Sequence, residues 1–187
     1  MQLVDGINCI YGPPASGKTN ICLFIAAQAK GKVIFIDTEN TFSAERIREF
    51  NPEANLDNIC LISADSFEKQ EKIIKELELL RKADIIIIDS LTKYYRTALK
   101  ESENHDLVGQ LRLLRRLYKE KGCKILITSQ VYTTDKDEIK PLGGKPIRDF
   151  SKQLVKLHVG NKRILEIIKP ESKKSDFCIE SASVAFS

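Results

Sequence analysis

Residues 10–21, with the sequence IYGPPASGKTNI, constrain the fold of this chain more than any other stretch. Gly12, four further residues and then Gly-Lys-Thr match the pattern of a phosphate-binding loop. Glycine at positions 12 and 17 lets main-chain amides turn toward an anion without interference from a Cβ atom, and the helix that follows directs its positive end at the same point. Such a loop joins a strand to a helix, so the pattern predicts an α/β protein that binds a nucleotide.

Particular atoms of this loop have predicted roles. Lys18 would bind the β and γ phosphates, and the Thr19 hydroxyl would bind Mg²⁺, which makes ATP with Mg²⁺ the expected ligand. The alternative is a Gly/Pro turn that holds no ligand. The residues expected to contact the nucleotide are Gly12, Pro13, Pro14, Ala15, Ser16, Gly17, Lys18 and Thr19.

Magnesium also needs an acidic partner from the end of a neighbouring strand, because ligands of open parallel sheets lie outside the carboxyl ends of the strands. Asp37 follows KVIFI and Asp89 follows DIIII, and we assign Asp89 to the metal. Either aspartate could instead cap a turn. Glu39 could orient and deprotonate an attacking water. Gln130 could sense the γ-phosphate and move the segment behind it, or be an ordinary hydrogen-bonded amide.

Apolar strands alternate with helical patterns along the chain, which predicts a parallel sheet covered by helices. With 187 residues and no linker or internal repeat, we expect one domain over residues 1–187. Gly160-Asn161 predicts a two-residue hairpin. The expected strands are 6–11, 32–36, 58–62, 84–90, 124–128 and an antiparallel pair at 153–159 and 162–168; the expected helices are one that starts near residue 17, 43–50, 66–83 and 107–121; residues 131–146 are expected to form a long loop.

The composition narrows the class of protein. No apolar stretch is longer than a strand, and the N-terminus has no signal-peptide pattern, so we expect a cytoplasmic protein with no membrane partner. Five scattered cysteines, with no C-x-x-C pair, indicate reduced core thiols rather than disulfides or a zinc site. Residues 1–90 hold 10 basic and 14 acidic residues, whereas residues 91–187 hold 20 and 12. This asymmetry indicates a polyanionic partner or a solvated, Lys/Glu-rich surface.

Two groups of basic residues could contact a polyanion. Arg112, Arg115, Arg116 and Lys119 form one stripe on the expected helix, which is more often a solvated face than a phosphate-binding one. In residues 131–148, an aromatic side chain is interleaved with cations and glycines, a combination that suits single-stranded nucleic acid, although three acidic residues count against it. The candidate DNA-binding residues are Tyr132, Lys136, Lys140, Lys145 and Arg148.

Taken in order, these motifs resemble the ATPase core of the RecA/RadA recombinase family, most closely its archaeal RadB group. GPPASGKT is followed by IDTENTFSAERI, IIIIDSLTKYYR, ILITSQV and PLGGKPI, similar to family segments in the same order. The resemblance implies a RecA-like, mostly parallel sheet flanked by helices, with antiparallel strands at its C-terminal end. It also implies roles for Glu39 as the catalytic glutamate, Asp89 as the Walker B aspartate, Arg46 against the adenine, and Gln130 as the switch between ATP and the DNA-binding loops.

Departures from the family pattern refine the expected function. The core begins within a few residues of Met1, so we expect neither the N-terminal helical DNA-binding domain nor the linker Phe-x-x-Ala motif of the full recombinases. The Phe-x-x-Ala string at 24–27 lies in the helix after the glycine loop, where core packing explains it. A homo-oligomer is compatible with this pattern, but a typical filament is not expected. Ser129, Asn40 and Ser43 also differ from the family residues.

The resulting expectation is a nucleoid-associated accessory or mediator protein of homologous recombination and DNA repair, with weak ATP hydrolysis. Its expected partners are DNA, single-stranded above all, and recombination proteins such as a RadA-type recombinase. The alternatives are a strand-exchange recombinase, a signalling ATPase resembling the KaiC group that acts on protein partners, and a small-molecule kinase.

Overall fold

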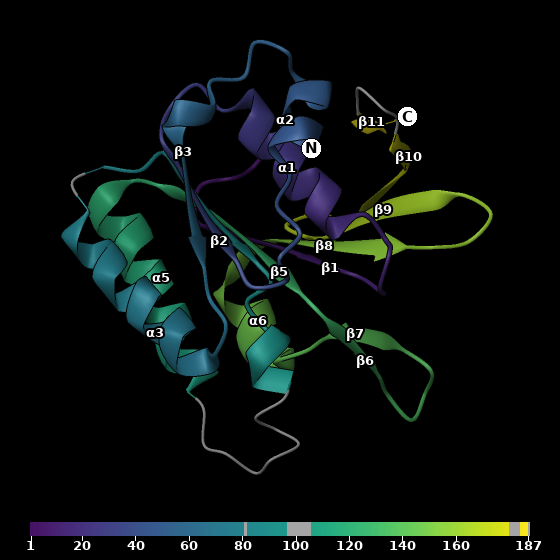
Figure 1. Cartoon of the computed structure of the whole chain (residues 1–187). Helices are drawn as coiled ribbons and strands as arrows, with labels where there is room; N and C mark the ends of the chain where they lie inside the picture. Colours follow the sequence, from purple (N-terminus) through teal and green to yellow (C-terminus); the bar gives the residue numbers. More distant parts are fainter. Residues whose placement is uncertain (81, 97–105, 180–183, 187) are drawn as a thin grey trace.

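The centre of the computed structural model is a nine-stranded sheet (Figure 1). The structure describes residues 1–80, 82–96, 106–179 and 184–186. The strand order is β11-β10-β9-β8-β1-β5-β4-β2-β3. The six strands from β8 to β3 in this order run parallel to one another, whereas β9, β10 and β11 pair antiparallel with their neighbours. The bounds are β1 (Ile7–Tyr11), β2 (Val33–Asp37), β3 (Ile59–Ser63), β4 (Ile85–Asp89), β5 (Lys124–Ser129), β8 (Ser151–His158), β9 (Arg163–Lys169), β10 (Lys173–Ile179) and β11 (Val184–Phe186). This mostly parallel sheet with antiparallel strands at its C-terminal end is the predicted RecA-like architecture.

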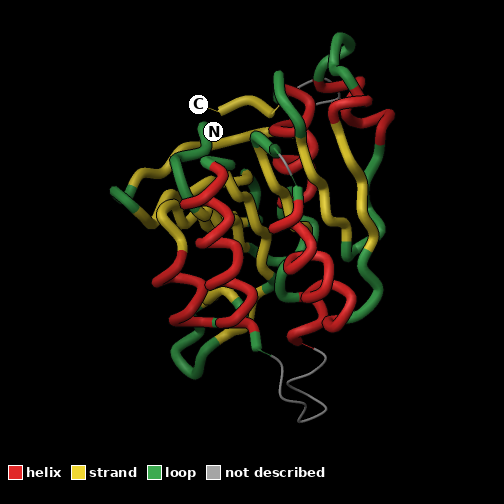
Figure 2. Tube along the Cα trace, turned by 90° about the vertical axis from the view of Figure 1, so that its left-hand side faces the viewer, coloured by secondary structure: helices red, strands yellow, loops and turns green. Residues whose placement is uncertain are grey.

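Helices cover both faces of the sheet and form layers separate from the strands (Figure 2). On one face, α1 (Lys18–Gln28) and α2 (Ala44–Phe50) contribute Ile21 and Ile47 to one apolar cluster. On the other face, α3 (Phe67–Glu76), α5 (Leu107–Lys121) and α6 (Gly144–Phe150) contribute to a second cluster. No described helix is both long enough and apolar enough to cross a membrane.

The isoleucine run of β4 explains why this strand is central. Ile86 and Ile88 point into the cluster under α3 and α5, whereas Ile87 points into the cluster under α1 and α2. All three are at most 1% exposed, because successive side chains of a strand point to opposite faces and both faces of this sheet are covered. The strand therefore needs apolar residues at these three positions, and only its last residue, Asp89, is polar.

Parallel pairing brings the polar residues that follow the strands to one edge of the sheet. Asp37 at the end of β2 is in register with Asp89 at the end of β4. Tyr11, which precedes the glycine loop, is in register with Ser129, which precedes Gln130. The glycine loop and the segments that follow β2, β4 and β5 therefore converge at one edge.

The predicted helix over 66–83 is too long. α3 ends at Glu76, and a single 3-10 turn, Leu77–Leu79, follows it. The Lys121 ammonium donates hydrogen bonds to the carbonyl oxygens of Glu78 and Leu80, at 2.8 and 2.6 Å. These tertiary bonds satisfy carbonyl groups at the end of the helical segment, a contribution that sequence periodicity does not reveal.

The predicted long loop at 131–146 is also wrong. It contains a two-stranded hairpin of β6 (Val131–Thr133) and β7 (Ile139–Pro141), followed by the start of α6. Thr134 and Glu138 close the hairpin, because the amide of Thr134 donates to the carbonyl of Glu138. Three-residue strands and a polar turn leave too little periodicity to be recognised in the sequence.

The C-terminal strands differ from the prediction in length and number. β8 and β9 are antiparallel as expected, but residues 159–162 separate them, so the connection is longer than a two-residue turn. β10 and β11 extend the sheet further and were not predicted. The expectation of core thiols is correct for Cys9, Cys22 and Cys123, whereas Cys60 and Cys178 are exposed; none of these five described cysteines is in a disulfide.

Candidate nucleotide-binding site

A cavity of about 420 Å³ lies at the edge where the strands converge. It brings together predicted residues from four segments of the chain: Gly12, Pro14, Lys18, Thr19, Glu39, Asp89 and Gln130. A second cavity, of about 340 Å³, lies on the other side of the glycine loop and is lined by Ala15, Gly17, Lys18, Thr19 and Asn20 together with Arg163 and Ile179. Lys18 and Thr19 line both cavities, so the loop separates two adjoining spaces.

The glycine loop is built on positions that exclude a Cβ atom. Gly17 precedes α1 with φ of +100°, a left-handed conformation that favours glycine. A Cβ on Gly12 would lie 2.8 Å from the carbonyl oxygen of Leu157. The Ser16 hydroxyl is buried and has no hydrogen-bond partner among the described residues. A buried hydroxyl without a partner, in a loop with two positions that exclude a Cβ atom, is compatible with a phosphate-binding cradle, so these residues fit a triphosphate.

Lys18 is folded back onto the loop. Its ammonium donates hydrogen bonds to the carbonyl oxygens of Gly12, at 3.0 Å, and Pro13, at 2.9 Å. Burial lowers the pKa of Lys18, and the nearby carboxylates of Asp89 and Glu39 oppose this shift. Both acceptors are neutral, so a phosphate would be a stronger partner for the ammonium.

Asp89 and Thr19 form the candidate metal site. Asp89 is 1% exposed and accepts hydrogen bonds from the hydroxyls of Thr19, at 2.6 Å, and Thr128, at 2.5 Å. Burial raises the pKa of the Asp89 carboxyl, and the two hydroxyls oppose this effect. Within the described residues there is no cluster of three or more His, Cys, Asp or Glu side chains that could hold a metal. One carboxylate and one hydroxyl suit Mg²⁺, which keeps several waters and takes its remaining ligands from phosphates.

Asp37 caps a turn, which is the alternative role that the sequence left open for it. Its carboxylate accepts hydrogen bonds from the main-chain amides of Glu39, Thr41 and Phe42, at 2.9 to 3.0 Å. The side chain is 3% exposed. Asp37 therefore shapes the turn that carries Glu39 to the cavity.

Glu39 and Gln130 are in direct contact. Glu39 Oε1 accepts hydrogen bonds from the Ser90 hydroxyl, at 3.0 Å, and from the Gln130 amide, at 3.1 Å. Arg96 extends the same chain of contacts, because its guanidinium donates to Gln130 Oε1 at 3.4 Å. Sequence reasoning did not single out Ser90 or Arg96, although both lie within the quoted segment DSLTKYYR. The contact between Glu39 and Gln130, which the sequence did not predict, is thus part of a chain of four side chains.

Arg46 lies near the second cavity and does not line either one. Its Nε donates to Asn20 Oδ1 at 3.0 Å, and Asn20 lines that cavity. The guanidinium also pairs with Glu49 and lies 4.5 Å from the centre of the Phe50 ring. Any contact of Arg46 with a base would be made from this position, next to α1.

The candidate DNA-binding residues are divided between the hairpin and α6. Tyr132 and Lys140 are direct cross-strand partners and share one face of the hairpin, with Tyr132 40% exposed. Lys140 pairs with Glu138 at 2.9 Å, which lowers the pKa of Glu138. Lys136 is exposed in the turn, and Lys145 and Arg148 are exposed on α6. Figure 1 shows the hairpin projecting from the body of the molecule.

The fold is that of RecA-like proteins, and comparison with known proteins confirms this class. The family model described as Rad51 matches residues 3–184, and the chain belongs to that family. A crystal structure of the RadB recombinase superposes with a TM-score of 0.79 and 24% identity, covering 97% of this chain and 90% of that one, which supports the fold.

Within the family, the curated relatives include archaeal RadB proteins. The DNA repair and recombination protein RadB of Methanocaldococcus jannaschii is 37% identical over 176 residues, which cover 87% of this chain and 82% of the relative. RadB of Methanococcoides burtonii is 33% identical over 195 residues, with 94% and 86% covered. The chain is thus a RadB-type member of the Rad51 family, as the order of its motifs indicated.

Proposed function

We propose that this chain is an ATP- and DNA-binding accessory protein of homologous recombination and DNA repair that hydrolyses ATP weakly. The main support for the proposal is a single cavity at the base of the β6–β7 hairpin. It is lined by Lys18, Thr19, Asp89, Glu39 and Gln130. The similarity to proteins named DNA repair and recombination protein RadB supports the biological setting. A RadA-type recombinase is the proposed protein partner.

Each side chain in this cavity has a proposed task. Lys18 would exchange its two carbonyl partners for phosphate oxygens. Thr19 and Asp89 would hold Mg²⁺, which when bound supplies positive charge against the phosphates. Glu39 would accept a proton from the attacking water, and the hydrogen bonds from Ser90 and Gln130 keep its carboxylate in place.

Gln130 links the nucleotide cavity to the hairpin. Its side chain contacts Glu39, whereas its main-chain carbonyl accepts a hydrogen bond from the amide of Leu142 at 2.8 Å. β6 begins at the next residue, and Leu142 directly follows β7. A movement of Gln130 would therefore act on both ends of the hairpin that carries Tyr132 and Lys136.

The first experiment tests nucleotide binding. We expect Lys18→Ala to abolish the binding of a fluorescent ATP analogue in the presence of Mg²⁺, because the ammonium is the cation closest to the phosphate-binding loop. The matched control is Lys30→Ala, which removes an exposed lysine just beyond the end of the same helix. An affinity of Lys18→Ala equal to that of the unmodified protein would refute the proposed site.

The second experiment tests DNA binding by the hairpin. Cations that contact phosphates release counterions, so affinity for single-stranded DNA should fall steeply as salt rises from about 50 to about 200 mM. Lys136→Glu should weaken binding and reduce the slope of log affinity against log salt by about 1. A flat salt response would exclude phosphate contacts. ATPase assays with and without single-stranded DNA would then show whether the two sites are coupled.

A further inference from the structure

A basic groove lies on the outer face of α5, at the end of the sheet opposite the nucleotide cavity. It consists of a cavity of about 630 Å³ and an adjoining hollow of about 440 Å³, which share Arg115, Lys119 and Phe150. Ile7, the first residue of β1, lines this groove, whereas the nucleotide cavity begins beyond the last residue of β1. The groove is therefore separate from the site described above and from the β6–β7 hairpin.

The basic stripe on α5 has the predicted geometry. Arg112, Arg115, Arg116 and Lys119 are exposed along one side of the helix, whereas Leu111, Leu114 and Leu117 are buried on the other. Successive turns of a helix are about 5.4 Å apart, so the stripe presents cations on successive turns over about 10 Å. This arrangement lets neighbouring phosphates of an extended strand each meet a cation.

Charge pairing distinguishes this stripe from an ordinary solvated face. On α3, the cations have carboxylate partners one turn away, Lys72 with Glu76 and Lys75 with Glu71. On α5, Arg116 pairs with Glu78 and Glu120. Arg112, Arg115 and Lys119, and also Lys152 of β8, have no ion pair or side-chain hydrogen bond with any described residue. The groove therefore keeps several cations without carboxylate partners.

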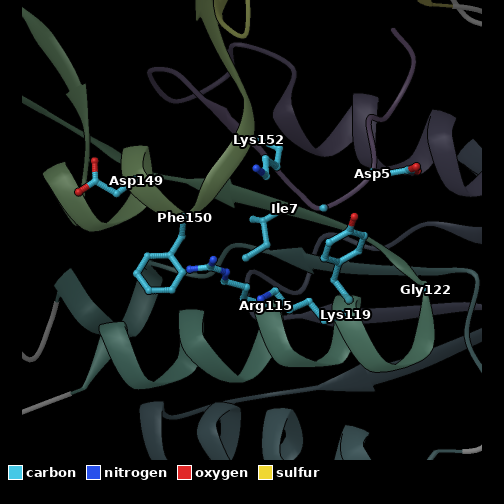
Figure 3. A pocket seen from close by; sticks show the side chains of 10 residues that line it. Asp5, Ile7, Arg115, Lys119, Gly122, Asp149, Phe150 and Lys152 are labelled. Atoms are coloured by element: carbon cyan, nitrogen blue, oxygen red, sulfur yellow. The ribbon is translucent and has the colours of Figure 1, made fainter.

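Three carboxylates line the groove: Glu120, which pairs with Arg116, and Asp5 and Asp149, which lie away from its cationic centre. Figure 3 shows Asp5 and Asp149 on opposite sides of the view, with Lys152, Arg115 and Lys119 between them. Asp5 lies 3.8 Å from Lys124, a cation outside the groove. Among the described residues, none of these three carboxylates therefore forms an ion pair with Arg115, Lys119 or Lys152.

An aromatic ring lies beside these cations. Phe150, the last residue of α6, is partly exposed, and Figure 3 shows the Arg115 side chain extending from α5 toward it. Tyr118 lines the same cavity. Cations along a groove with an aromatic ring between them are the features by which proteins bind single-stranded nucleic acid, since the cations contact phosphates and the ring stacks on a base.

We propose that this α5 groove is a second binding site for single-stranded nucleic acid. Phosphates would lie against Arg112, Arg115, Lys119 and Lys152, and one base would stack on Phe150. An acidic protein segment fits less well, because it would use the cations but would not need an aromatic ring at this position. The proposal goes beyond the proposed function, which places DNA contacts on the hairpin, and either site could fail without the other.

The test compares two charge-matched double variants in full-length protein without nucleotide. Arg115→Glu with Lys119→Glu alters the groove, whereas Arg48→Glu with Lys82→Glu makes the same charge change at exposed residues outside it. The ligand is a fluorescein-labelled oligothymidylate of about 20 nucleotides, followed by anisotropy. We expect the affinity of the groove variant to fall by about 10- to 100-fold, and its slope of log affinity against log salt to decrease by about 2. The affinity of the control variant should stay within about threefold of that of the unmodified protein.

A second variant tests the aromatic contact. Phe150→Leu keeps an apolar side chain for folding and removes the ring, so affinity should fall at least about fivefold while the salt slope stays unchanged. Equal affinities of the groove and control variants would overturn the proposal. Unchanged binding of the oligonucleotide, together with loss of binding to fluorescent poly-glutamate in the groove variant, would instead assign the groove to an acidic protein segment. Binding of the ATP analogue should be the same in all these variants, which separates this test from that of the nucleotide site.

Discussion

Replacing Asp89 with asparagine should stabilise the nucleotide-free protein while removing its response to Mg²⁺. The carboxylate is almost fully buried and is held by two hydroxyl groups, those of Thr19 and Thr128. An asparagine side chain has nearly the same shape, and both hydroxyls can form neutral hydrogen bonds with its amide. The substitution therefore removes a buried charge without creating a cavity.

The expected size follows from two opposing contributions. A hydrogen bond to a charged group contributes about 1.5–3 kcal/mol and a neutral one about 0.5–1.5 kcal/mol, so the exchange loses about 1 kcal/mol for each of the two hydroxyls. Burying the ion costs several kcal/mol, and burial is the dominant cause of the raised pKa of Asp89. We expect Asp89→Asn to raise the free energy of unfolding by about 1–2 kcal/mol and Tm by roughly 2–8 °C at pH 7.

The difference in stability between Asp89→Asn and the unmodified protein should depend on pH in one direction. Below the ordinary pKa of 3.8, the carboxyl is protonated in the folded and unfolded states alike. As the pH rises above 3.8, the unfolded chain releases its proton before the folded one does, so the native protein loses stability until the pH passes the raised pKa. The stability advantage of Asp89→Asn should therefore grow through this window and then stay constant.

Thermal unfolding in EDTA, from pH 4 to pH 8, measures this difference directly. A second series with Mg²⁺ and an ATP analogue should raise the Tm of the unmodified protein and leave that of Asp89→Asn nearly unchanged, because a bound ligand stabilises only the protein that binds it. The reasoning is refuted if Asp89→Asn is the less stable protein at pH 7, or if both proteins respond equally to Mg²⁺ and the analogue.

Three further substitutions test the loop, the N-terminal hydrogen bonds and the core. Gly17→Ala should cost about 1–3 kcal/mol in unfolding by urea and weaken nucleotide binding, since φ is +100° and the new Cβ would lie 2.4 Å from Ile179; full stability would contradict the strain. Asn8→Ala should cost about 2–4 kcal/mol, because this fully buried side chain serves three main-chain carbonyls and one amide; a cost below about 1 kcal/mol would show that water replaces it. Leu114→Ala, at 0% exposure, should cost about 3 kcal/mol and lower Tm by roughly 6–12 °C, whereas exposed Arg112→Ala should stay within about 0.5 kcal/mol.

The parts of the fold that the sequence predicts are those with a local physical cause. α5 runs from Leu107 to Lys121 as predicted, because its leucines recur at helical spacing and Gly122 ends it in a left-handed conformation. β4 is predicted by an isoleucine run that only a strand covered on both faces explains. The nucleotide cavity follows from the same logic, because parallel strands bring their carboxyl ends to one edge and so bring Asp89 to the glycine loop.

The parts that the sequence does not predict depend on contacts between distant residues. The 3-10 turn that follows α3 is held by hydrogen bonds from Lys121, which lies more than 40 positions further along the chain. The role of Ser90 depends on the position of Glu39, and the sequence shows only that both follow strands. The sequence does not show which cations of α5 are paired. In the structure, Arg116 has carboxylate partners, whereas Arg115 has none among the described residues.

Nucleotide binding at this site would be an exchange of partners rather than a gain of contacts. In the described structure, Lys18 already bonds to two carbonyls, Thr19 to Asp89, and Glu39 to Gln130. The hydrogen bonds of Lys18 and Thr19 must be given up on binding, so the affinity measures only how much better the phosphates and Mg²⁺ are as partners. The same exchange provides the coupling, because a partner that draws Glu39 away from Gln130 frees Gln130, the residue directly before β6. A nucleotide that leaves the bond between Glu39 and Gln130 intact should therefore bind without changing the affinity of the hairpin for DNA.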